Sequence, residues 1–95
     1  MLSMRLMSLK QAEKLLENAL AAKADATEIT VFTFKKDRLL GLYRQVDQLR
    51  LLENGYGKSQ QSFTIEQRHE CRHALKAALK VEFPRSRQVY VNVRK

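Results

Sequence analysis

Apolar residues near the start of the chain recur at helical spacing. The positions on this mostly apolar face are Leu9, Ala12, Leu16, Ala19, Leu20 and Lys23. Ser8 and Gln11, at the start of this stretch, have the spacing of a capping box. In a capping box a hydroxyl and an amide satisfy the first backbone N–H groups of a helix. The pattern predicts a helix over residues 8–24. Residues 1–7 show no such pattern and are expected to be a flexible lead-in to one domain spanning residues 8–95.

A second helical pattern occupies the C-terminal half. Thr64 and Gln67 repeat the capping-box spacing, and a mostly apolar face follows at Ile65, Arg68, Cys71, Leu75, Ala78, Leu79 and Glu82. Pro84 disfavours helix at the residue before it, so this helix is expected over residues 65–81. Residues 88–93 then alternate between polar and apolar, which is typical of a half-buried strand.

The middle of the chain favours strands. Residues 28–34 are dense in β-branched and aromatic residues, without Gly or Pro, and predict a strand. Residues 38–53 fit either one helix or two strands, at 39–45 and 48–53. Gly41 inside a helix would cost about 1 kcal/mol relative to Ala, so the two strands are the favoured interpretation.

An Asn-Gly pair follows these strands. Asn54 and Gly55 both tolerate positive φ, which suits a tight hairpin or, alternatively, a left-handed helix cap. The polar residues 56–62 are either a further strand or a loop. The expected order is therefore α-β-β-β-(β)-α-β. It predicts an α+β fold, a small two-layer domain whose mostly antiparallel sheet carries two helices on one face.

Length and cysteine content narrow the class of protein. With 95 residues the chain is expected to form one domain with a small core. Its single cysteine, Cys71, cannot form an internal disulfide, which favours the reducing cytoplasm. No apolar run approaches the roughly 20 residues that a membrane-spanning helix needs, so no membrane association is expected.

Charge is distributed unevenly along the chain. The net charge is +8, and residues 58–95 hold nine basic and three acidic residues against nine and seven in residues 1–57. In the second helix four basic residues share one stripe: His69, His73, Lys76 and Lys80. The last three lie four, seven and eleven residues after His69, which places them on the same side of a helix. The predicted polyanion-binding residues are this stripe and its neighbours: Arg68, His69, Arg72, His73, Lys76, Lys80, Arg85 and Arg87.

The order helix, three strands, helix, with basic residues on the second helix, resembles the layout of double-stranded-RNA-binding domains. Residues 55–59 have a Gly-x-Gly-x-Ser spacing that fits this likeness, but residues 60–63 lack the lysines expected there. The aromatic residues do not suggest a stacking surface: Phe32, Phe34, Tyr43, Phe63 and Phe83 are expected in the core. Tyr56 and Tyr90 are the two candidates for stacking on bases.

Residues 69–73, His-Glu-Cys-Arg-His, match the zinc hydrolase motif. Two histidines four apart on a helix reach one metal ion, and Glu70 would act as general base. A catalytic zinc needs a third protein ligand, and Glu82 is the one carboxylate after His73. Glu82 lies nine residues after His73, too far along the helix to reach a metal ion held by the two histidines. The match is therefore interpreted as a coincidence of two surface histidines. Cys71 is expected to pack in the core rather than to act as a nucleophile.

Three functions follow, in decreasing order of support. The first is a non-enzymatic module, without a cofactor, that binds nucleic acid or another polyanion through the basic helix. The alternative is an accessory or inhibitory factor that docks on an acidic protein, or a homodimer formed through an exposed C-terminal strand. The third is a minimal zinc hydrolase that uses His69, His73 and Glu70.

Overall fold

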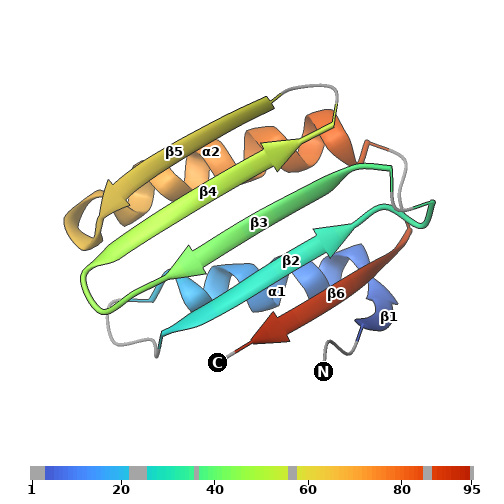
Figure 1. Cartoon of the computed structure of the whole chain (residues 1–95), viewed down its shortest axis with the longest axis horizontal. Helices are drawn as coiled ribbons and strands as arrows, with labels where there is room; N and C mark the ends of the chain where they lie inside the picture. Colours follow the sequence, from blue (N-terminus) through green and yellow to red (C-terminus); the bar gives the residue numbers. More distant parts are fainter. Residues whose placement is uncertain (1–3, 22–25, 36, 56–57, 85–86, 95) are drawn as a thin grey trace.

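The computed structural model describes residues 4–21, 26–35, 37–55, 58–84 and 87–94. Within these residues, six strands, two α-helices and one 3₁₀ turn follow one another (Figure 1). In order they are β1 (Met4–Ser8), α1 (Leu9–Ala19), β2 (Thr27–Phe32), β3 (Leu39–Arg44), β4 (Gln48–Asn54), β5 (Lys58–Thr64), η1 (Ile65–Gln67), α2 (Arg68–Glu82) and β6 (Gln88–Arg94).

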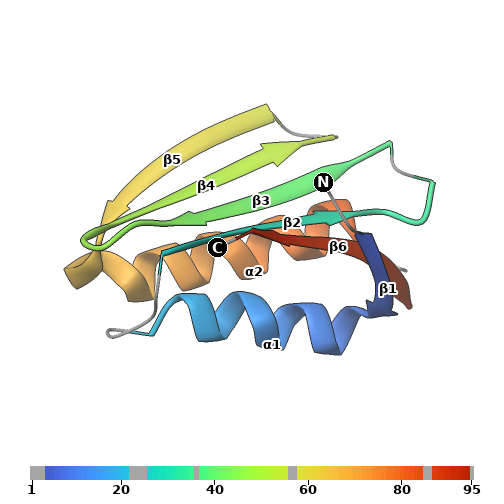
Figure 2. The same cartoon turned by 60° about the horizontal axis from the view of Figure 1, so that its bottom comes forward.

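All six strands form one sheet, in the order β1-β6-β2-β3-β4-β5, and every neighbouring pair is antiparallel. Both helices lie on the same face of this sheet (Figure 2). Helix α1 packs on β1, β6 and β2, whereas α2 packs on β3, β4 and β5. The predicted two-layer α+β fold is thus confirmed. We call the other sheet face, which neither helix covers, the open face.

The core lies between the sheet and the helices. From the sheet it takes the alternate residues that face the helices, among them Ile29, Val31, Leu40 and Leu42. The helices contribute the apolar stripes that the periodicity predicts. These are Ala12, Leu16, Ala19 and Leu20 from α1 and its end, and Cys71, Leu75, Ala78 and Leu79 from α2.

Helix α1 begins as the sequence predicts and ends earlier. Ser8 caps it, since the Gln11 backbone N–H donates to the Ser8 hydroxyl and the Gln11 side chain accepts from the Ser8 backbone N–H. The helix ends at Ala19 rather than at residue 24, and residues 22–25 lie outside the described part. The side chain of Arg44 lies at this end and donates to the carbonyls of Ala19 and Ala21. A buried arginine therefore satisfies carbonyls that the helix leaves without partners.

The two-strand interpretation of residues 38–53 is confirmed by β3 and β4. The polar stretch from residue 58 is a strand, β5, so Asn54 and Gly55 do lead into a hairpin between β4 and β5. The reason given for Gly55 is wrong, however. Its φ is not in the left-handed range, and the glycine is needed because a Cβ there would collide with the side chain of Glu82.

Two expectations about the ends of the sheet are wrong. Residues 4–7 are not a flexible lead-in but part of β1, which pairs with β6 from Met4 opposite Asn92 to Ser8 opposite Gln88. As a result, the C-terminal strand β6 lies inside the sheet, between β1 and β2. The two edge strands are β1 and β5, so β6 offers no free edge through which a homodimer would form.

Candidate nucleic-acid interface

The basic side chains of α2 form a ridge on its outer side. His69, Arg72, His73, Lys76 and Lys80 are all exposed. The opposite side of the helix is buried against the sheet and consists of Cys71, Leu75, Ala78 and Leu79. We call Arg72, Lys76 and Lys80, which recur every four residues, the α2 ridge. At 1.5 Å per residue the ridge extends about 12 Å along the helix.

One carboxylate of α1 faces this ridge. Glu17 Oε1 lies 2.9 Å from Nη2 of Arg72, accepts from Nε of Arg72 at 3.1 Å, and lies 3.8 Å from Nζ of Lys76. All three side chains remain between about two-fifths and one-half exposed, so water screens these contacts. Lys80 makes no ion pair with any residue that the structure describes. Glu17 therefore offsets one of the three positive charges of the ridge.

The surface is hollowed between the two helices on either side of these ion pairs. One hollow, of about 220 Å³, is lined by Glu17, Leu20, Ala21, Arg68, His69 and Arg72. The other, of about 440 Å³, is lined by Leu9, Glu13, Lys76, Leu79, Lys80, Phe83 and Pro84. Cations of α2 border both hollows on one side, and the carboxylates of Glu17 and Glu13 from α1 border them on the other.

The remaining predicted residues do not all join the ridge. Arg68 is half-buried and donates from Nη1 to the carbonyl of Ile65, so it stabilises the start of α2. Arg87 is exposed just before β6, and its carbonyl accepts from the backbone N–H of Leu9. It lies by the start of α1, where Leu9 lines the same hollow as Lys80. Arg85 lies outside the described residues.

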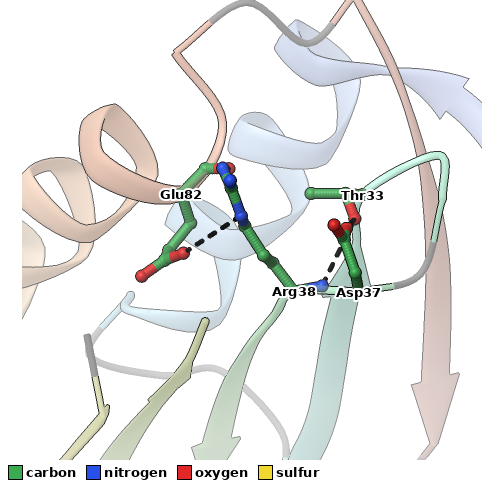
Figure 3. Close-up of polar contacts among 4 residues, drawn as sticks. All are labelled: Thr33, Asp37, Arg38 and Glu82. Atoms are coloured by element: carbon green, nitrogen blue, oxygen red, sulfur yellow. Dashed lines mark hydrogen bonds and ion pairs between the residues drawn. The ribbon is translucent and has the colours of Figure 1, made fainter. Parts of the chain in front are cut away.

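The His-Glu-x-x-His segment lacks the third ligand considered for it. His69 and His73 are exposed on α2, whereas Glu82 is only 1% exposed and lies thirteen residues after His69, about 20 Å along the helix axis. Its Oε1 lies 4.0 Å from Nε of Arg38 (Figure 3). Among the described residues no group of three or more His, Cys, Asp or Glu is placed to hold a metal ion.

Glu82 belongs instead to a polar cluster at the far end of α2. Nη1 of Arg38 also donates to the Glu82 carbonyl, and the Ser59 hydroxyl donates to Oε1 of Glu53. Burial and the neighbouring Glu82 carboxyl raise the pKa of Glu53. The cluster joins β3, β4 and β5 to α2, which is a structural role in this fold.

Cys71 is buried on the core side of α2, and burial raises the pKa of its thiol to about 11. The thiolate, not the thiol, is the nucleophile, so the native protein is expected to resist alkylation by iodoacetamide at pH 8. Mass spectrometry should find Cys71 labelled only after denaturant is added. Labelling of the native protein as fast as of the denatured protein would contradict this burial.

The expected burial of the aromatic residues is partly wrong. Phe83 is buried, and Phe63 packs against the core from β5. Phe32 and Tyr43 are only half-buried and point to the open face, and Phe34 is 60% exposed. The sequence did not separate the two groups because apolar residues occupy both faces of β2. Tyr56, one of the two stacking candidates, lies outside the described residues, whereas Tyr90 is on the open face.

Comparison with protein-family models, with curated proteins and with solved structures gave no match to this chain. The layout departs from that of double-stranded-RNA-binding domains, because four strands rather than three separate the helices here. In the part of the chain that the structure describes, neither helix is long and apolar enough to cross a membrane.

Proposed function

We propose that this chain is a non-enzymatic module that binds the phosphate backbone of nucleic acid along the α2 ridge. The observation that supports this most is the exposure of Arg72, Lys76 and Lys80 in one row on the solvent side of α2. Each cation that neutralises a phosphate releases a counterion, so a row of cations binds a polyanion in a strongly salt-dependent way.

The ion pairs with Glu17 fit this function. An exposed pair of this kind contributes only about 0.2–1 kcal/mol, and it lies open to solvent between the helices. A phosphate at the groove would replace the Glu17 carboxylate as the partner of Arg72 or Lys76. Because Glu17 competes with the ligand, Glu17→Gln is expected to tighten binding, whereas substitutions in the ridge weaken it.

The test is reversal of charge along the ridge. The variant R72E/K76E/K80E should lose detectable binding to labelled duplex RNA or DNA in fluorescence anisotropy at about 0.15 M salt. At low salt, the slope of log K against log salt should decrease in magnitude by about 2–3, one for each lost phosphate contact. The matched control is K10E/K14E/K35E, which makes the same change in net charge at exposed lysines outside the ridge.

Circular dichroism of both variants establishes that the fold is retained. If the two triple variants weaken binding equally, the attraction is due to net charge alone and the ridge is not the site. If neither variant changes the affinity, or the parent protein binds no nucleic acid, the proposal is overturned.

A further inference from the structure

An apolar row crosses the open face of the sheet. The register of the strands places Leu6 of β1, Tyr90 of β6, Phe32 of β2 and Leu39 of β3 side by side. Phe34, just beyond β2, stacks on Tyr90 with ring centroids 5.8 Å apart and an angle of 22° between the planes. Phe34 is 60% exposed, so one of its ring faces remains available to another flat group.

The turn after β2 keeps Phe34 in this position. The hydroxyl of Thr33 donates to Oδ1 of Asp37 at 2.6 Å and accepts from the backbone N–H of Arg38 (Figure 3). The Thr33 backbone N–H donates to the Arg38 carbonyl at 3.1 Å, which closes the turn. Thr33 is buried toward the helices, and its neighbour Phe34 is therefore directed to the open face. The turn and the stack on Tyr90 thus set the position of the ring.

The same row becomes polar and positive toward the other edge of the sheet. Leu39 is followed across the sheet by Asn54 of β4 and Lys58 of β5. Arg50 of β4 also lies on the open face, opposite Tyr43 of β3. Neither Arg50 nor Lys58 forms an ion pair within the part of the chain that the structure describes. The one acidic residue of β2, Glu28, lies on this face directly opposite Arg94.

We propose that the open face is a second site, which binds single-stranded nucleic acid by stacking a base on Phe34 and Tyr90. Its phosphates would run toward Arg50 and Lys58, across four strand spacings or about 19 Å, which is room for a few nucleotides. Aromatic rings beside a positive groove are the combination that binds single strands without regard to base sequence. In a duplex the bases are paired and stacked inside the helix, so this face requires a single strand.

The charge of the face argues against a second copy of the chain as its occupant. Two copies packed through this face would bring Arg50 and Lys58 of both into one interface, with Glu28 opposite Arg94 as the one carboxylate of β2 there, in a protein of net charge +8. A polyanion instead neutralises these cations. The site is on the opposite side of the sheet from the α2 ridge. It rests on the proposed function only in that both sites bind nucleic acid.

The experiment uses a short single-stranded oligonucleotide that contains 2-aminopurine, whose fluorescence falls when the base stacks. The full chain should quench it, and Phe34→Ala should weaken the binding about tenfold, as expected for the loss of one base–aromatic stack. Phe34→Tyr should retain binding, whereas Phe34→Leu should not, because Leu is apolar but lacks a π-face. The control is Val46→Ala, which removes a side chain that is 84% exposed in the turn between β3 and β4.

Salt dependence separates this site from the ridge. Phe34→Ala should leave the slope of log K against log salt unchanged, whereas R72E/K76E/K80E should change the slope and leave the quenching of bound 2-aminopurine in place. Unchanged affinity in Phe34→Ala, or equal binding by Phe34→Leu and the parent, would overturn the proposal. So would sedimentation showing a dimer that Phe34→Ala dissociates, since a second copy would then occupy the face.

Discussion

Replacing Arg44 by Met is expected to lower the free energy of unfolding by about 2–4 kcal/mol, a large part of the stability of a domain of this size. Arg44 is only 2% exposed. Its Nη1 donates to the carbonyls of Ala19, at 3.1 Å, and Ala21, at 2.6 Å, and its Nε donates to the carbonyl of Gln45, at 2.8 Å. Met fills a similar volume but donates no hydrogen bond, so the carbonyls at the end of α1 would be left without this partner.

Denaturation by urea, followed by circular dichroism, measures this loss. Arg50→Met is the matched control, since Arg50 is an exposed arginine on the next strand and its replacement should change stability by less than about 0.5 kcal/mol. Arg44→Lys should fall between the parent and Arg44→Met, because an ammonium keeps the charge but does not reproduce the planar fork of donors. Equal stability of Arg44→Met and Arg50→Met would show that water replaces Arg44 as the hydrogen-bond donor to the carbonyls at the end of α1.

The helices and the inner strands were predictable because their signals are local. The capping pair of Ser8 and Gln11 and the apolar stripe behind it lie within one helix, and the same holds for α2. Strand β1 was not predictable. Met4 and Leu6 lie on the open face and Met7 on the helix face, so no alternation is visible, and the residues that pair with β1 are 80 to 88 positions away. Pairing over that distance leaves no mark on a single sequence.

In the candidate sites, too, local features were predictable from the sequence and long-range contacts were not. The α2 ridge follows from helical spacing, but the sequence gives no sign that Glu17, 55 residues before Arg72, pairs with it. The open face was missed for a different reason. In β2, Ile29 and Val31 face the helices while Phe32 faces the other way, and hydrophobicity alone does not tell which apolar residue is buried. The pairing of β6 with β2 decides which residues of β2 face the helices, and this pairing is a property of the fold.

Gly55→Ala is expected to destabilise the protein by about 1–3 kcal/mol, although Gly55 has no left-handed backbone conformation to require glycine. A Cβ at this position would overlap Oε1 of Glu82, lie 2.8 Å from its Cδ, and lie 2.9 Å from Cγ of Arg38. The Glu82 carboxylate has no free space to move into, because it is buried and pairs with Arg38. The methyl group therefore forces apart the contact that joins β3 and β4 to the end of α2.

A double-mutant cycle tests this cause. In the Glu82→Ala background the overlap with the carboxylate is gone and the 2.9 Å contact with Cγ of Arg38 remains. Gly55→Ala should therefore cost less there than in the parent, and the coupling energy should be a large part of the cost measured in the parent. Gly41→Ala is the control for a second glycine in the same sheet. Its Cβ would meet the Tyr43 hydroxyl at 3.3 Å, and that ring tip lies at the open face, where it has room to shift. If Gly55→Ala costs the same with and without Glu82, the glycine is required by the backbone of the hairpin or by Arg38, and not by the buried carboxylate.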